Sequence, residues 1–274
     1  MPSLARDPDD GIVAVGSGGV WKTENRGTTW ASVFDGQGSY SIGCVTIDPS
    51  NPEIVWVGTG ENVSGRHVGF GDGVYKSLDG GATWNNMGLE ASEHIGMIRV
   101  DPRDSDVVYV AAQGPLWSGG GDRGLYKTTD GGESWQRILG GGDYTGVNEV
   151  HLDPRDPDVI YAVRHQRFRN VAALINGGPE SGIYKSTDAG KTWKGAGLEK
   201  SRHIPRLRVH PDNPDVIYAA AYERRRHVWG LMAGGPNGGI YKSSDAGASW
   251  KKLARGLPQG DVGKIGLAVT AANP

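Results

Sequence analysis

The sequence has one cysteine, no long apolar run and almost no excess charge. The lone Cys44 excludes an internal disulfide. No stretch approaches the roughly 18 apolar residues of a membrane-spanning helix, and the N-terminus has no basic segment followed by an apolar one, as a secretory signal would. Because 29 basic side chains nearly cancel 31 acidic ones, net charge does not favour a nucleic-acid or membrane-surface protein.

Glycine, in contrast, is abundant: 45 of 274 residues, or about 16%, roughly twice ordinary usage. The apolar fraction of 37% supports a packed core. No collagen period is present, so the composition indicates a folded protein in which turns are frequent.

The chain contains an internal repeat, Ser/Thr-x-Asp-x-Gly-x-Thr/Ser-Trp, here called the box motif. An aromatic residue precedes each box tryptophan by nine positions. Full copies occupy residues 77–84, 128–135, 186–193 and 243–250, and a weaker copy with Asn25 in the aspartate position occupies residues 23–30.

Each repeat also carries a β-branched run, such as Val107-Val108-Tyr109-Val110, after a turn of the Asp-Pro type. These are strand and turn signals. A unit of about 55 residues thus holds four short antiparallel strands, which is a propeller blade. The sequence predicts an all-β protein, a single β-propeller domain over residues 1–274 with five blades at about 1–36, 37–90, 91–142, 143–200 and 201–258.

The two ends of the chain are expected to share a blade. Residues 262–269 read as a first strand, and residues 12–15 supply a second. Pairing of these segments would close a five-bladed ring and remove its free edges. The alternative is that the chain forms part of a six- or seven-bladed ring.

The box motif is predicted to be structural. The aspartate accepts backbone N–H groups of its own turn, the glycine supplies a positive φ, and the tryptophan packs between sheets. The structural residues are Asp79, Trp84, Asp130, Trp135, Asp188, Trp193, Asp245 and Trp250.

Length variation is concentrated in the connection from the second to the third strand of each repeat. From box tryptophan to the next second-strand aromatic the spacing is 25 or 26 residues, whereas the connection itself varies from 7 to 23. Function usually occupies long loops on a rigid frame, so these connections are the predicted binding face. The ligand-binding candidates there are Arg66, His67, Trp117, Arg123, Arg164, His165, Arg167, Arg169, Arg224, Arg226, His227 and Trp229.

Charge is unevenly distributed between these connections and the Asp-Pro turns. The connections hold more arginines than acids, whereas the turns are mainly acidic. A basic face favours an anionic ligand such as a uronic or sialic acid, a sulfated glycan or an acidic peptide. The alternative for the arginines is that they pair with nearby groups and only hold their own loops in place. For Trp117 and Trp229 two roles stay open, which are stacking on sugar rings and packing at the base of their own loops. The histidines lack metal-ligand spacing, so no metal site and no cofactor are predicted.

The box motifs, Gly58-Thr59-Gly60-Glu61-Asn62 and the repeated Gly-Gly-Pro at 177–179 and 234–236 resemble bacterial Asp-box (BNR) repeat propellers, which are related to sialidase, xyloglucanase and sortilin-type propellers. The resemblance covers the whole chain and implies the fold more strongly than an activity. A xyloglucanase-like enzyme would need two carboxylates on the loop face, and the candidates are Glu61 and Glu223, joined by Glu149. No sialidase arginine motif precedes the first box.

Two hypotheses follow. The first is a glycan-binding or glycan-processing propeller, glycosyl-hydrolase-like, with an oligosaccharide or polysaccharide over the basic face. The second is a non-catalytic scaffold that binds a peptide or protein. A lyase acting on uronic acids is a third. Whether the protein is an enzyme stays open, and an extracellular or periplasmic location is implied by the resemblance alone.

Overall fold

The computed structural model describes residues 11–199 and 203–270, whose regular secondary structure consists almost entirely of short antiparallel strands. This confirms the all-β prediction. Helical structure in these residues is confined to a 3-10 turn at Glu90–Ser92 and to Glu199, and in this part of the chain no helix is long and apolar enough to cross a membrane.

The chain divides into two compact units, and each is described by itself. The first comprises the described residues up to Pro115 together with Gly120–Arg137; the second comprises Leu116–Gly119 and the described residues from Ile138 onward.

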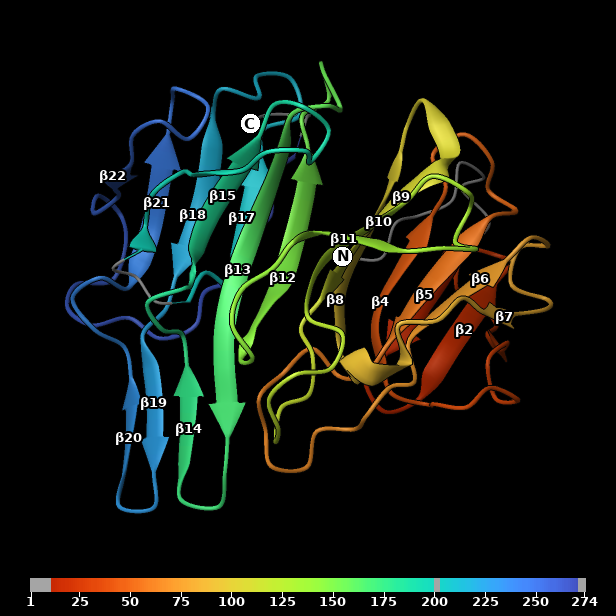
Figure 1. Cartoon of the computed structure of the whole chain (residues 1–274), viewed down its shortest axis with the longest axis horizontal. Helices are drawn as coiled ribbons and strands as arrows, with labels where there is room; N and C mark the ends of the chain where they lie inside the picture. Colours follow the sequence, from red (N-terminus) through yellow and green to blue (C-terminus); the bar gives the residue numbers. More distant parts are fainter. Residues whose placement is uncertain (1–10, 200–202, 271–274) are drawn as a thin grey trace. The chain divides into compact units, whose positions relative to one another are not determined.

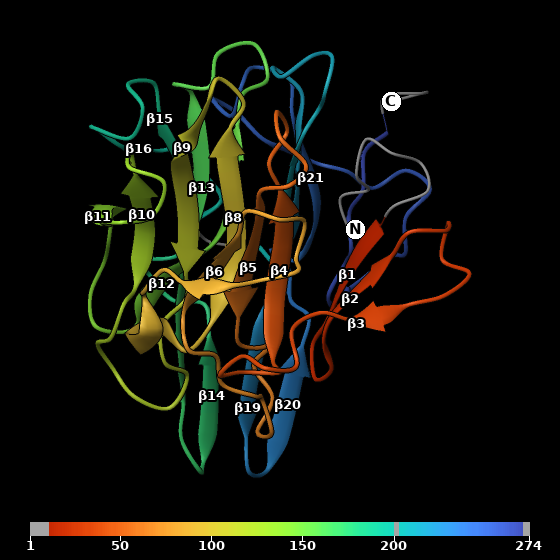
Figure 2. The same ribbon diagram turned by 90° about the vertical axis from the view of Figure 1, so that its right-hand side faces the viewer.

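The first unit contains three successive sheets. The sheet β1-β2-β3 has three strands, and β4-β5-β6-β7 and β8-β9-β10-β11 have four each (Figures 1 and 2). Their apolar side chains meet in cores around Trp56 and Phe34. The strands are β1 Gly11–Val15, β2 Gly19–Thr23, β3 Ala31–Ser32, β4 Ile42–Ile47, β5 Val55–Thr59, β6 Val74–Ser77, β7 Asn85–Asn86, β8 Ile95–Asp101, β9 Asp104–Ala112, β10 Gly124–Thr128 and β11 Gln136–Leu139.

The second unit contains two four-stranded arrangements of the same kind, β12-β13-β15-β16 and β17-β18-β21-β22. Three further strands, β14, β19 and β20, join the first of these through the far end of β13. The strands are β12 Thr145–Leu152, β13 Ile160–Arg169, β14 Ala173–Asn176, β15 Gly182–Ser186, β16 Lys194–Gly195, β17 Arg206–Val209, β18 Ile217–Ala221, β19 Arg224–His227, β20 Gly230–Ala233, β21 Gly239–Ser243 and β22 Lys251–Lys252.

The box motifs form the turns before the last strand of each sheet. In the first full copy, Asp79 Oδ1 accepts the Thr83 N–H at 2.8 Å while Oδ2 accepts the Thr83 hydroxyl at 2.6 Å. Gly81 in this turn has a φ of +94°. The hydroxyl and N–H of Thr83, with help from Ser77, lower the pKa of Asp79 to about 2. The Asp79 carboxylate is therefore satisfied within the turn, whereas the Gly80 N–H bonds outside it, to Glu53 O at 2.9 Å.

Three box tryptophans also bond to the sheet that precedes their own. The indole N–H of Trp84 donates to Val33 O at 2.8 Å, Trp135 to Met87 O at 2.7 Å and Trp250 to Ala196 O at 2.7 Å. Trp30 instead bonds to Gly27 O in its own turn and is 42% exposed. Trp193, which belongs to a full copy, likewise bonds within its own turn, to Gly190 O at 3.1 Å. Three of the four full motifs thus connect neighbouring sheets through their tryptophans.

One expected strand is absent from the structure. Residues 262–269 have no strand assignment, although their side chains alternate between half-buried and exposed as in a strand. The prediction of a strand here is wrong because alternation reports one buried face, whereas a strand also needs a hydrogen-bonded neighbour. Leu267 and Val269 line a small cavity beside Tyr218 and Ile240.

Candidate functional site

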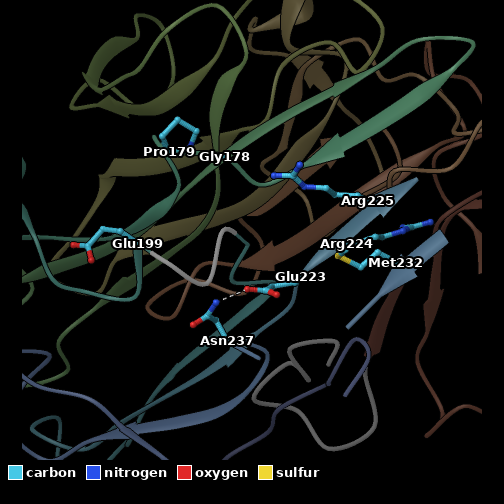
Figure 3. A pocket seen from close by; sticks show the side chains of 8 residues that line it. All are labelled: Gly178, Pro179, Glu199, Glu223, Arg224, Arg225, Met232 and Asn237. Atoms are coloured by element: carbon cyan, nitrogen blue, oxygen red, sulfur yellow. Dashed lines mark hydrogen bonds between the residues drawn. The ribbon is translucent and has the colours of Figure 1, made fainter. Parts of the chain in front are cut away.

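A cavity of about 570 Å³ lies in the second unit beside the β19-β20 hairpin and the turns that precede β15 and β21 (Figure 3). That volume is in the range of small-molecule sites. Four chain segments supply the lining: the turn before β15, the segment after β16, the start of the β19-β20 hairpin and the turn before β21. The lining residues are Gly178, Pro179, Glu199, Glu223, Arg224, Arg225, Met232 and Asn237.

Glu223 is the most constrained carboxylate of this cavity. It is buried between β18 and β19, and its Oε1 accepts the Asn237 side-chain N–H at 2.7 Å. Its backbone oxygen accepts the Gly234 N–H at 2.9 Å. Gly235 packs so closely on the carboxylate that a Cβ there would overlap Oε2. The Gly-Gly-Pro repeat at 234–236 therefore shapes the wall that holds Glu223 in place.

The other charged groups of the cavity are two arginines and a second carboxylate. Arg224 and Arg225 follow Glu223 directly and begin β19, and Arg225 is paired across the hairpin with Met232. Glu199 enters from the segment after β16 and is exposed. Carboxylates and guanidinium groups thus line the same hollow, an arrangement suited to hydrogen-bonding a polar ligand.

The second unit also contains a buried pair of histidines, one on β13 and one before β17. The rings of His165 and His203 stack with centroids 3.9 Å apart, and the Asn176 side-chain N–H donates to His203 Nδ1 at 2.8 Å. Burial, followed by the positive charges of Lys264 and Arg167, lowers the pKa of His203 to about 3. His203 is therefore neutral near pH 7, and its Nδ1 is an acceptor.

Glu149 does not line the cavity. It is fully buried, and its oxygens accept from Arg206 at 2.9 Å and from the Leu207 N–H at 2.7 Å, with His151 at 3.2 Å. Burial alone would raise the pKa of this carboxyl, but the His151 hydrogen bond and the arginine charges hold it below its ordinary value. This is the environment of a structural carboxylate.

Four of the sequence-predicted residues lie in the first unit. Glu61 accepts a hydrogen bond from the Ser17 hydroxyl, and Arg66 and His67 are exposed on the same connection. Arg123 is buried and donates to Gly120 O at 2.7 Å, to Gln113 O at 2.9 Å and to Pro115 O. Arg123 thus pins its own loop, the alternative left open above.

The remaining predicted residues lie in the second unit but mostly outside the cavity. Arg164 stands 4.7 Å from the Tyr184 ring and 3.9 Å from Glu180. Arg167 and Arg169 are buried, and Arg169 lies 5.8 Å from the Trp117 ring. At the hairpin tip Trp229 stacks on His227 at 4.8 Å and is 81% exposed. Arg226 is exposed on β19.

Of the sequence-predicted residues, the structure brings Glu223 and Arg224 into the cavity. Sequence reasoning missed Glu199, Arg225, Met232 and Asn237 as lining residues. The repeated Gly-Gly-Pro could have located Asn237, which follows the second copy directly. Nothing in the local pattern singles out Glu199, because only the fold carries it to the cavity.

Comparison with known proteins shows similarity to GH74 enzymes, although no protein-family model matches the sequence. A xyloglucanase from Hypocrea jecorina is 22% identical over 86% of this chain and 30% of its own length. An ancestral GH74 enzyme superimposes with a TM-score of 0.67 at 20% identity, covering 94% of this chain and 31% of the enzyme. The Niastella koreensis GH74 enzyme gives 0.60 at 18%, covering 89% and 34%.

The chain thus spans about a third of the length of these relatives. At such identities the structural likeness concerns the fold. It shows that the chain has the all-β propeller architecture found in GH74 glycosyl hydrolases.

Proposed function

We propose that this chain is a glycan-processing propeller module of glycosyl-hydrolase type, and that the cavity of the second unit binds the saccharide. The observation that carries the proposal is the cavity itself, because Glu199 and Glu223 both line it. Glycoside hydrolysis uses two carboxyl groups, one of which protonates the leaving oxygen while the other attacks the sugar or activates water. The similarity to xyloglucanases supports a saccharide as the ligand.

Glu223 is the better-placed of the two for a role that needs a fixed geometry. The Asn237 hydrogen bond and the close approach of Gly235 restrict its side chain. Glu199 is exposed and freer. We assign the pair on this basis in place of Glu61 and Glu149, because Glu149 is fully bonded to protein groups and Glu61 belongs to the first unit.

The proposed saccharide carries negative charge. Residues 164–176 and 224–233, which form the hairpin strands at the cavity, hold six arginines and no aspartate or glutamate. Arg224 and Arg225 of this set reach the cavity, where bidentate pairing with a sugar carboxylate is favourable. An extracellular or periplasmic site of action belongs to the same proposal.

Calorimetry and product analysis with xyloglucan oligosaccharides and oligogalacturonates test this proposal. We expect the purified chain to bind and cleave one of these classes, and Glu223→Gln to lower the rate at least about 100-fold, the usual contribution of a positioned acid or base. Glu133→Gln, an exposed carboxylate in a box turn of the first unit, is the matched control and should change nothing. Equal rates for both variants would contradict the assignment.

The alternative is a non-catalytic scaffold for a peptide or protein. It is favoured by β20, which ends the strand order of its sheet and exposes Leu231 and Met232, because an exposed edge strand can pair with another chain. Binding of a peptide library without binding of any saccharide would support this alternative.

A further inference from the structure

Four side chains form a row across the hairpin strands of the second unit. The pairing registers place Phe168 of β13 opposite Ile175 of β14, Ile175 opposite Arg225 of β19, and Arg225 opposite Met232 of β20. Directly opposed residues of antiparallel strands point to the same face of a sheet. These four residues, here called the cross-strand row, therefore share one face of strands that lie side by side in Figure 1.

On β13 and β14 the cross-strand row is on the solvent-exposed face, whereas β19 and β20 expose residues of both faces. In the neighbouring row, which points to the opposite face, Leu174 is 1% exposed and Arg169 is buried. Ile175 of the cross-strand row is 46% exposed. Beyond Phe168 the row is continued by the exposed Tyr144, whose ring meets the Phe168 ring edge-on at 4.8 Å.

The cross-strand row begins in the cavity. Arg225 and Met232 are lining residues of the cavity and members of the row at once (Figure 3). From Met232 the row crosses three strand spacings to Phe168, about 14 Å at ordinary strand separation. This is longer than a single sugar ring, so a ligand that extended along the row from the cavity would be an oligomer.

The chemistry of the row matches an acidic sugar chain. Tyr144, Phe168 and Ile175 offer apolar surface to the C–H faces of sugar rings, and Arg225 offers a charged fork to a carboxylate. We propose that the cross-strand row binds further units of a uronate-containing polysaccharide, part of which occupies the cavity. This inference rests on the proposed function and deepens it, because it makes the ligand a polymer whose carboxylates are recognised.

The test compares chain lengths and charge. We expect an oligogalacturonate decamer to bind about tenfold more tightly than the trimer, equivalent to about 1.4 kcal/mol. The double variant Phe168→Ser, Ile175→Ser should remove this difference and leave trimer binding intact. Arg225→Gln should abolish the preference for the decamer over its carboxyl-reduced form.

A matched control comes from the opposite face of the same strands. Leu231→Ser changes an exposed residue one position away from Met232, and it should leave the length dependence unchanged. Circular dichroism checks that every variant is folded.

The possible failures are distinguishable. If trimer and decamer bind with equal affinity while Glu223→Gln still lowers the cleavage rate, the proposal that the cross-strand row binds sugar units is wrong and the proposed function stands. If no saccharide binds, the proposed function fails first. If polyglutamate binds as tightly as the decamer, the attraction is charge alone, and the assignment to a sugar chain is overturned.

Discussion

The two units build the connection between the second and third strands in different ways. In the first unit the connections are irregular and are held by side chains that bond to backbone, as Arg123 does to three carbonyl groups. In the second unit the corresponding connections become hairpins that add β14, β19 and β20 to a sheet. The same repeat framework therefore accepts either an irregular loop or paired strands in the connection between its second and third strands. The cavity lined by carboxylates and arginines lies beside the paired strands.

The largest expected effect concerns what the units share, the box tryptophans. Trp135 bonds to Met87 O and meets the Trp56 ring edge-on at 6.3 Å. Trp135→Ala should lower the free energy of unfolding by about 3 to 5 kcal/mol because it leaves a cavity between sheets. Trp30→Ala is the control, since Trp30 is exposed and should cost less than about 1 kcal/mol. Similar losses in urea unfolding would break the distinction between full and weak motifs.

The next effect isolates the irregular connections of the first unit. Arg123→Ala removes charged donors from three carbonyl groups in a buried site and should cost about 3 kcal/mol. The exposed Arg226 of the β19-β20 hairpin is the counterpart in the second unit, and Arg226→Ala should stay within about 0.5 kcal/mol. If Arg123→Ala were as mild as Arg226→Ala, the connection would not depend on this pin.

Acid sensitivity should distinguish the second unit. The pKa of His203 is about 3 when folded and about 6.5 in an unfolded chain. As pH falls below about 6.5, His203 becomes protonated in the unfolded state but stays neutral in the folded state. The free energy of unfolding therefore decreases. We expect a loss of about 2 kcal/mol between pH 7.5 and 5, and His203→Gln should remove this part of the pH dependence.

Hydrogen exchange can assign this loss to its unit. Amides of β13 and β18 should lose protection on acidification in the unchanged protein, whereas those of β5 and β9 should not lose protection through this histidine. Equal loss in both units, unchanged by His203→Gln, would contradict the assignment.

The smallest expected effect concerns the box-turn aspartates, which occur in both units, and the stability of the protein in acid. The pKa values of Asp79, Asp188 and Asp245 are lowered to about 2 by hydroxyl and N–H donors of their own turns. A lowered carboxyl pKa gives stability that is present above about pH 4 and lost as pH falls toward 2. Because these groups are exposed the effect is modest, and Asp79→Asn should flatten the acid end of a urea-midpoint profile slightly. A steeper profile in this variant would be the contrary result.

Much of the framework could be read from the sequence because its signals are local. The carboxylate of a box turn finds its hydrogen-bond donors within a few residues, so the motif predicts its local structure wherever it occurs. The constant spacing from Trp84 to Tyr109 likewise reports strands of fixed length. Residues 262–269 show the limit of such reasoning, because their alternation is local whereas a strand's hydrogen-bonded partner is not.

The site was only partly predictable for the same reason. Glu223 and Arg224 were found because they lie in a long basic connection, but Arg167 and Arg169 look equally available in the sequence and are buried in the structure. Which face of a strand a side chain takes depends on register, and the register between β14 and β19 joins segments about fifty residues apart.

The sequence by itself determined the repeating antiparallel sheets, the box turns that join them and the position of the variable connections, since each depends on contacts within a short segment or on a fixed spacing. Tertiary structure alone decided that two connections form hairpin strands, that Glu199 and Glu223 line the same cavity, and that Arg225 is exposed beside it. Those outcomes depend on pairing and burial between distant segments, for which a linear pattern carries no local signal.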